Sequence, residues 1–396
     1  MSNKIFSIFY KVKTNEYRFY TPWNNDFKTL DYSEYLKVKL KYELMKGYDK
    51  SEDIDINLQL YYLDFKKWND ELYKNGLHTY MYGGDTNENN VLRAFKDNSE
   101  FNLYNDELID DIEAQYFDSC NNGYLEWCKE GAYDCYGYDM NSFYPRMLSE
   151  NKLKIPVKAG YETRLESLDK YNLKYGLYKV VIECYHEDFV KTFKFSENNT
   201  YTHYSLIFAY LYQEQYNIKI DLNLTEKYNA YLYNDEDLIE SKNIFGNWFN
   251  KLMVVKNKHK DNKLVKHLLS SVWGTLCSKN KKKCFAVEEN ELENYDEEKY
   301  IVDTIDYEKN IYYLTEKEKR PRYKYNIRLM PFLLSYSRSF LGKIAQDNHI
   351  KEIIRICCDN ITYKSDVIIN VPNFLPEEKT TGKFTWKNAR VWTKTD

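Results

Sequence analysis

The sequence contains little proline or glycine, and several common signals are missing from it. Its 396 residues include 7 prolines and 13 glycines, and we find no internal repeat and no low-complexity linker. No stretch approaches about 18 uncharged apolar residues, so we expect no membrane-spanning helix. The N-terminus lacks the apolar segment and cleavage site of a signal peptide. These absences predict a folded protein of the cytoplasm.

The eight cysteines form no C-x-x-C pair and no cluster with zinc-type spacing. In a long chain without a signal peptide, this pattern indicates reduced thiols in a cytosol-like compartment. Cys120, Cys128 and Cys135 could hold a metal, but buried small apolar side chains are the interpretation we prefer.

The overall charge is slightly negative, with a formal net charge of -4. Any affinity for nucleic acid must therefore come from a local basic surface. Residues 250–283 offer one, because they contain ten lysines and a single acidic residue, Asp261. A Lys-rich surface helix is the ordinary alternative, but so one-sided a balance favours a phosphate-facing segment.

Hydrophobic periodicity predicts a mixture of helices and strands. Strands are expected in residues 5–20 and 178–186, helices in residues 35–48 and 58–77, and a loop in residues 81–90. Residues 245–279 predict two antiparallel helices that break at residues 259–262. A further helix is expected from Met330 to Gln346, followed by a strand, a polar turn and a second strand.

The first motif is YGYDMNSFYPRML, residues 136–148. An aromatic approach ends in Asp139, where a carboxylate at the end of a buried strand can hold a divalent cation. The chain then turns into a helix whose first N–H groups can face a triphosphate. An ordinary strand-to-helix turn capped by Asp, Asn and Ser would explain the same residues.

The second motif is KLVKHLLSSVWGTL, residues 263–276. Helical spacing places Lys266, Ser270, Trp273 and Gly274 near one face. A lysine there can reach a triphosphate, and glycine permits close approach of a ligand. A Leu-rich core helix with an exposed lysine is the alternative.

The first motif is similar to the D-x-x-S-L-Y-P signature of family B DNA polymerases, and the chain resembles their protein-primed type over about residues 110–396. The resemblance implies that Asp139 binds the metal. It also implies that the Tyr144 ring lies beneath the incoming sugar and excludes a 2′-hydroxyl.

The second motif resembles the fingers motif K-x-x-x-N-S-x-Y-G of the same family. Lys266, Ser271 and Gly274 match it, whereas Ser270 replaces the Asn and Trp273 replaces the Tyr. By this resemblance Lys266 binds the nucleotide triphosphate. Lys256, on the preceding helix, is expected to be a second triphosphate contact.

The third motif is RICCDNITYKSD, residues 355–366, where the family carries D-T-D-S. Our alignment places Asp359 under the first aspartate and Ile361 under the second. Isoleucine cannot ligate Mg²⁺, so this alignment predicts a damaged two-metal site. Asp359 or Asp366 would be the substitute carboxylate.

Three further matches extend the resemblance. Arg338 lies in a segment like the palm helix, Lys394 matches the lysine that contacts the primer, and Tyr116 lies where the family has its template-contacting Y-x-G-G. Asp396 stands where a tyrosine is expected. Residues 1–105 contain no credible set of exonuclease motifs, and no thumb is expected after the primer-contact strand.

We therefore expect an α+β fold, with a polymerase palm of antiparallel sheet and packed helices, a helical fingers hairpin, and no complete exonuclease or thumb. The expected divisions are an N-terminal α/β region, the first part of the palm, the fingers, an acidic insertion and the second part of the palm, at residues 1–105, 106–244, 245–284, 285–328 and 329–396.

The resemblance implies template-directed deoxynucleotidyl transfer in DNA replication of a virus or linear plasmid, in the host cytoplasm if viral. Mg²⁺ or Mn²⁺ would be the cofactor, and DNA template, primer and dNTP the partners, together with a priming terminal protein or a second polymerase subunit. One alternative is a catalytically inactive nucleic-acid-binding or scaffold protein. Another is an unrelated α+β protein, in which Asp139 and Asp359 would lie far apart rather than on adjacent strands.

Overall fold

The structure is a computed structural model that describes most of the chain. The described residues are 6–13, 16–21, 25–31, 33–35, 43–46, 53–78, 87–103, 107–120, 123–150, 152–280, 284–295, 297–307, 310–316, 322–348, 352–364 and 370–394. Asp366 and Asp396 lie outside these ranges. Within them, no helix is both long enough and apolar enough to cross a membrane.

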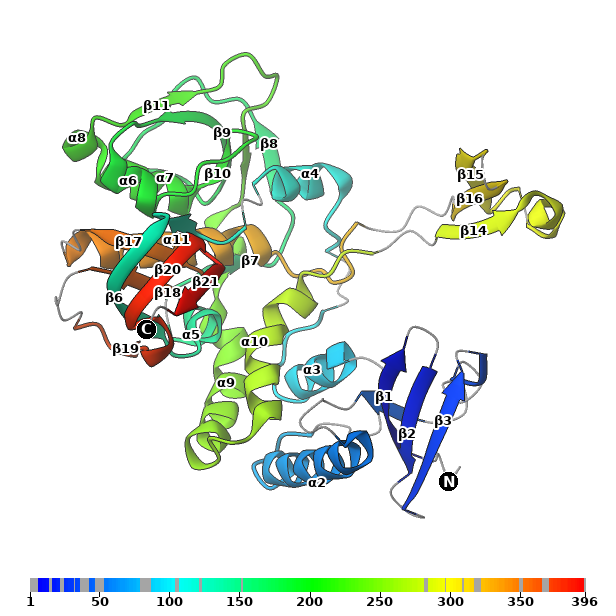
Figure 1. Cartoon of the computed structure of the whole chain (residues 1–396). Coiled ribbons are helices and arrows are strands. Elements are labelled where there is room, and N and C mark those ends of the chain that lie inside the picture. The colour runs from blue at the N-terminus through cyan, green and yellow to red at the C-terminus, as the bar shows by residue number, and fades with distance from the viewer. Residues whose placement is uncertain are drawn as a thin grey trace.

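A seven-stranded antiparallel sheet carries the first and third motifs (Figure 1). Its strands follow the order β21-β20-β6-β18-β17-β5, and β19 pairs with the end of β6. The strand–turn–strand expected in the third motif is present as β17 and β18. The strands are β5 (Glu126–Cys128), β6 (Gly131–Met140), β17 (Ile353–Cys357), β18 (Asn360–Tyr363), β19 (Phe374–Pro376), β20 (Gly382–Asn388) and β21 (Val391–Lys394).

Two helices contribute to the main core beside this sheet. α5 (Phe143–Ser149) follows β6 after a two-residue turn, and α11 (Met330–Asp347) packs against it. The prediction of a helix from Met330 with Pro331 at its start is confirmed, since proline fits a first turn in which its missing N–H is not needed.

The predicted helical hairpin is confirmed as α9 (Ser241–Lys258) and α10 (Lys263–Leu276). Asn262 begins α10 by accepting a hydrogen bond from the Val265 backbone N–H at 3.0 Å, which satisfies one of the free donors of a helix start. The apolar stripe of α10 is buried and consists of Leu264, Val265, Leu268, Leu269, Val272 and Leu276.

A second sheet, following α5, has its own hydrophobic core. The strand expected at residues 178–186 is present there as β9 (Gly176–Glu183). Around it lie β8 (Tyr161–Thr163), β10 (Thr200–Thr202), β11 (Lys219–Leu222), β12 (Ala230–Leu232), α6 (Glu187–Thr192), α7 (His203–Leu211) and α8 (Gln213–Tyr216). A short antiparallel pair is formed by β7 (Lys154–Pro156) and β13 (Leu238–Glu240). The 3₁₀ turn Asp235–Asp237 comes just before β13, and β13 leads directly into the helical hairpin.

The N-terminal region forms a four-stranded sheet with two helices. The strand order is β3-β2-β1-β4, in which β4 alone is parallel to its neighbour β1. Helix α2 contacts the hairpin, and at its tip Lys67 pairs with Asp261 at 2.9 Å. The elements are β1 (Phe6–Lys13), β2 (Glu16–Thr21), β3 (Asp26–Asp31), β4 (Glu43–Lys46), α2 (Ile54–Tyr73) and α3 (Asn87–Lys96).

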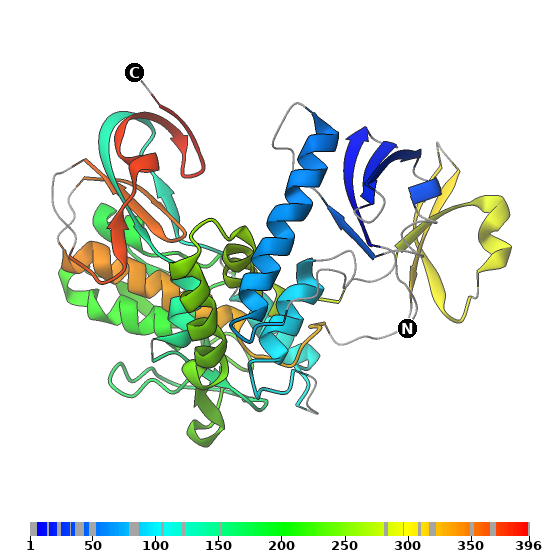
Figure 2. The same cartoon turned by 90° about the horizontal axis from the view of Figure 1, so that it is seen from below.

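Residues 284–316 form a three-stranded antiparallel sheet that stands far from the seven-stranded sheet in both views (Figures 1 and 2). It consists of β14 (Cys284–Glu288), β15 (Tyr300–Asp306) and β16 (Ile311–Glu316), with a 3₁₀ segment at Glu289–Asn294. These strands lie within residues 285–328, the region that we expected as an acidic insertion, apart from Cys284 at the start of β14.

Two predictions of local structure were wrong. Residues 43–46 form a strand rather than part of a helix, because pairing with β1 overrides local helical spacing. Residues 87–90 belong to α3 rather than to a loop, since Asn also favours helix starts. The predicted loop at 81–86, and residues 36–42 and 47–48 of the predicted helix, lie outside the described residues.

Candidate active site

The strand register places four polar side chains in one row across the seven-stranded sheet. Asp139 on β6 lies opposite Asn360 on β18, Asn360 opposite Cys357 on β17, and Cys357 opposite Glu126 on β5. Residues directly opposite one another point to the same face of a sheet. Asp359 lies in the adjoining turn, where its carbonyl accepts a hydrogen bond from the Met140 N–H at 2.9 Å. Asp139, at the end of β6, and Asp359, in the β17–β18 turn, therefore lie near one another at this edge of the sheet.

Ile361 follows Asn360 on β18, and its side chain lies on the opposite face of the sheet from Asn360 and Asp139. It is opposite Tyr138 on β6, and its side chain has no exposure to solvent. Both residues belong to the main hydrophobic core, together with Tyr363 two positions along β18. Because side chains alternate between faces, an isoleucine here does not occupy a position that faces Asp139.

A third carboxylate near Asp139 was not found by sequence reasoning. The Glu377 carboxylate accepts hydrogen bonds from Asn360 Nδ2 and from the Thr380 hydroxyl, both at 2.9 Å. Its segment folds closely over β6, where the Glu377 N–H donates to the Gly137 carbonyl at 2.8 Å. A Cβ on Gly137 would lie 1.8 Å from the Thr380 hydroxyl oxygen, so only glycine permits this approach. No motif marked Glu377, because this contact is made by the tertiary structure.

The electrostatics of the row reflect crowded, partly buried carboxylates. Burial, then the charges of Asp359 and Glu377, raise the pKa of Asp139 to about 7. Burial, and then the charge of Glu377, raise the pKa of Asp359. The charge of Lys266 on α10 partly offsets the rise in both pKa values.

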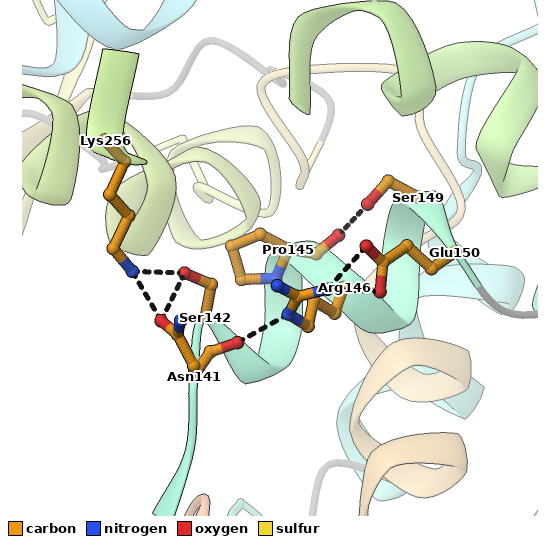
Figure 3. A network of polar contacts seen from close by, with 7 residues as sticks. All are labelled: Asn141, Ser142, Pro145, Arg146, Ser149, Glu150 and Lys256. Atoms are coloured by element: carbon orange, nitrogen blue, oxygen red, sulfur yellow. Dashed lines mark hydrogen bonds and ion pairs between the residues drawn. The ribbon is translucent and has the colours of Figure 1, made fainter. Parts of the chain in front are cut away.

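The turn after β6 is held by Lys256 from α9 (Figure 3). Its Nζ donates to Asn141 Oδ1 and to the Ser142 hydroxyl, each at 2.6 Å. Ser142 adopts a left-handed φ of 57° and forms no side-chain cap, so the turn is not an ordinary capped helix start. Arg146 secures the other side, donating to the Asn141 carbonyl at 2.8 Å and pairing with Glu150.

The face of α10 predicted from helical spacing is open. Lys266, Ser270 and Gly274 are exposed, and a Cβ built on Gly274 meets no atom within 4 Å. The Trp273 ring lies 5.4 Å from the Tyr144 ring, which joins the second motif to the first.

A cavity of about 450 Å³ opens beside this aromatic pair. Its lining comes from both motifs, from the β17–β18 turn and from the C-terminal hairpin, and consists of Tyr124, Tyr144, Ser270, Trp273, Arg355, Cys357, Cys358, Arg390 and Trp392. The structure thus brings the predicted residues Tyr144, Ser270 and Trp273 together around one space.

Three other predicted residues lie outside the cavity lining. Arg338 is buried and donates to the Gly123 carbonyl at 2.5 Å, so it supports the chain that leads to Tyr124. Tyr116 is buried on α4 (Asp111–Ser119), where it contacts Tyr231 and donates to Glu162 at 3.3 Å. Lys394 is exposed, two residues along β21 from Trp392 and hence on the same face as that cavity residue.

The donor set of this site fits a hard divalent cation. Mg²⁺ and Mn²⁺ prefer carboxylate oxygens, and Asp139 and Asp359 supply two carboxylates that interact electrostatically. No hydrogen bond or ion pair from the described residues engages the Asp139 carboxylate, although it is only half-exposed and crowded by two other carboxylates. A partly buried, unpaired carboxylate of this kind gains most from a bound cation.

Comparisons with known proteins give a consistent picture of the fold. No protein-family profile matches the sequence. No curated protein matches it either. Solved structures do match it, at low sequence identity. Phi29 DNA polymerase complexed with primer-template DNA, in a post-translocation binary complex, matches with a TM-score of 0.54 at 12% identity, covering 92% of this chain and 81% of the other.

The ternary complex of Phi29 DNA polymerase with primer-template DNA and incoming nucleotide substrates matches with a TM-score of 0.51 at 14% identity, covering 96% of this chain and 71% of the other. At 92% coverage only about 32 residues stay unmatched, so the likeness extends well into residues 1–105, beyond the range expected from the motifs. The chain therefore has a fold similar to that of Phi29 DNA polymerase.

Proposed function

We propose that this protein is a DNA polymerase that adds deoxynucleotides to a primer under the direction of a template, in replication of a viral or linear-plasmid genome. The observation that carries the proposal is the approach of Asp139, at the end of β6, and Asp359, in the adjoining β17–β18 turn, with Lys266 of α10 acting on both carboxyls electrostatically. The Phi29-like fold supports it, and the Phi29 complexes contain DNA and nucleotides. The seven-stranded sheet with α5 and α11 would act as the palm, and α9 and α10 as the fingers.

Each side chain has a distinct role in this proposal. Asp139 and Asp359 hold Mg²⁺ or Mn²⁺, which when bound would stabilise the negative charge of the transferring phosphoryl group. Lys266 and the face around Ser270 and Gly274 bind the triphosphate and the nascent base pair. Tyr144, packed against Trp273, forms the floor beneath the sugar.

Lys256 acts indirectly, by holding the turn that positions Asp139. Lys394, on the cavity face of β21, is the proposed primer contact. Arg338 supports the loop before β5 from beneath, and the burial of Tyr116 favours a structural role over template contact.

The register also changes how the third motif aligns with D-T-D-S. With Ile361 in the core, we place Asp359 under the second aspartate and Cys357, opposite Asn360, under the first. The carboxylate that pairs with Asp139 is then present, and the substitution falls on the first aspartate. This placement favours an active metal site over the damaged one expected from the sequence.

An inactive scaffold derived from a polymerase stays the second candidate. The observation that favours it is the thiol of Cys357 in the polar row, at the position that we align with the first aspartate of D-T-D-S. A priming terminal protein or a second polymerase subunit remains part of the proposal as a partner.

The test is primer extension by the purified chain on a primed DNA template with dNTPs and Mg²⁺ or Mn²⁺. The expected result is extension by the wild type, loss of extension in Asp139→Asn, and retention in Asp134→Asn, an exposed carboxylate on the same strand. Failure of the wild type while it still binds primed DNA would support the scaffold. Extension that survives in Asp139→Asn would show that the activity arises elsewhere.

A further inference from the structure

A cluster of sulfur and oxygen ligands lies at the other end of the polar row. Cys357 and Cys358 are adjacent in the chain, and their Sγ atoms lie 3.8 Å apart. Glu126 is directly opposite Cys357 on β5. The two sulfur atoms and one Glu126 carboxylate oxygen all lie within 4.8 Å of one another. Among the described residues, no other group of three His, Cys, Asp or Glu side chains brings its ligand atoms this close together.

The sulfur spacing matches that of a metal-bound pair. Two thiolates on one tetrahedral zinc, each about 2.3 Å from the metal, lie about 3.8 Å apart. A disulfide would need about 2.05 Å between the same atoms. Cys358 adopts a left-handed φ of 59°, and its N–H donates to the Leu125 carbonyl at 3.2 Å, so the backbone holds both thiols on one side of the turn.

We propose that Glu126, Cys357 and Cys358 bind a thiophilic divalent cation, of which Zn²⁺ is the representative, at a site separate from Asp139 and Asp359. Thiolates favour soft or borderline ions over Mg²⁺, whereas the carboxylate site favours hard ions. Both cysteines line the 450 Å³ cavity, so the fourth coordination position would open toward it. An ion bound there would share this space with whatever ligand contacts Tyr144 and Trp273.

Arg390 would compete with a bound cation for the Glu126 carboxylate. Its Nε donates to Glu126 Oε1 at 2.9 Å, and a second guanidinium nitrogen contacts the same oxygen. A cation must share or displace this ion pair. The side chain is largely exposed, at 61%, so its removal should leave the sheet intact.

The test uses the reduced, chelator-treated full chain titrated with Cd²⁺ in excess Mg²⁺, following thiolate-to-cadmium absorption in the ultraviolet. The wild type is expected to bind one Cd²⁺, and Cys358→Ser to lose this signal. Glu126→Gln should weaken binding by at least about tenfold, because losing a ligand should cost no less than losing a group that only supports a ligand. Arg390→Ala should tighten binding, because it frees Glu126.

The matched control is Cys277→Ser, which removes a partly buried thiol at the end of α10 and should leave binding unchanged. Thermal melts of each variant establish that it is folded. The proposal is overturned if the wild type binds no Cd²⁺, if folded Cys358→Ser binds it as well as the wild type, or if Arg390→Ala binds it more weakly. None of these readouts depends on polymerase activity, so failure of this site and failure of the proposed function are distinguishable.

Discussion

The two ends of one row across the seven-stranded sheet differ in chemistry although they share strands and a turn. At one end, Asp139 and Asp359 offer oxygens, with Glu377 nearby. At the other, Cys357 and Cys358 offer sulfur beside Glu126. The two ends share one sheet, so the ligand atoms decide which cation each end prefers. Four predictions test this division.

The largest expected effect is loss of activity at the oxygen end. Asp359→Asn should lower primer extension roughly 10³-fold or more, the scale observed when one group of a cooperating catalytic set is removed. Cadmium binding at the sulfur end should persist in the same variant. If Asp359→Asn retains extension while Cys357→Ser loses it, the ends have been assigned the wrong roles.

The next effect concerns the reverse face of β18. Ile361→Asp places a charge in a fully buried position, so it should lower the free energy of unfolding by roughly 4 kcal/mol, the range of buried unpaired charges. It should not improve Mg²⁺ binding, because the side chain points away from Asp139. Ile361→Val is the matched control and should cost about 1 kcal/mol. Urea unfolding and Mg²⁺ titration test whether the side chain at position 361 faces the core or faces Asp139. A stable Ile361→Asp variant with tighter Mg²⁺ binding would support the alignment first derived from the sequence.

A smaller effect is expected when the sulfur end is converted to oxygen. Cys357→Asp should lower the Mg²⁺ concentration for half-maximal binding by about tenfold, comparable with a supporting carboxylate around a metal. It should also abolish cadmium binding. The measurement is calorimetric titration with each ion, and Cys357→Ser serves as the control of similar size. An unchanged preference for cadmium would mean that Cys357 is not a ligand.

The smallest effect is a dependence of stability on pH. The raised pKa of Asp139, about 7, means that the folded protein binds more protons than the unfolded chain between about pH 4 and pH 7. This carboxyl therefore contributes stability at low pH that is lost as the pH rises through about 7. Melting temperatures should fall more steeply over that range in the wild type than in Asp139→Asn. Mg²⁺ should reduce the fall in the wild type, and equal slopes in both proteins would contradict the crowding of the carboxylates.

Much of the fold was predictable wherever local signals agreed with tertiary packing. The helical hairpin, the helix from Met330 and the strand of residues 178–186 each combine strong periodicity with clear boundaries. The helix predicted at residues 43–46 was wrong because these residues pair with β1, which lies more than 30 residues away in the chain. Contacts at such separation leave no local signature.

The candidate site was only partly predictable. Asp139, Asp359, Tyr144 and Lys266 were found because contiguous motifs contain them. Glu377 was missed because it reaches β6 only through the close approach at Gly137.

The sequence by itself determined which chemical groups the molecule possesses: the first motif, the lysine-rich hairpin and the adjacent cysteine pair. Only the tertiary structure decided which of them face one another. A strand has a period of two, so a shift of one residue exchanges a ligand position for a core position. For that reason the role of Ile361 followed from the pairing of β18 with β6, and not from the letters of the motif.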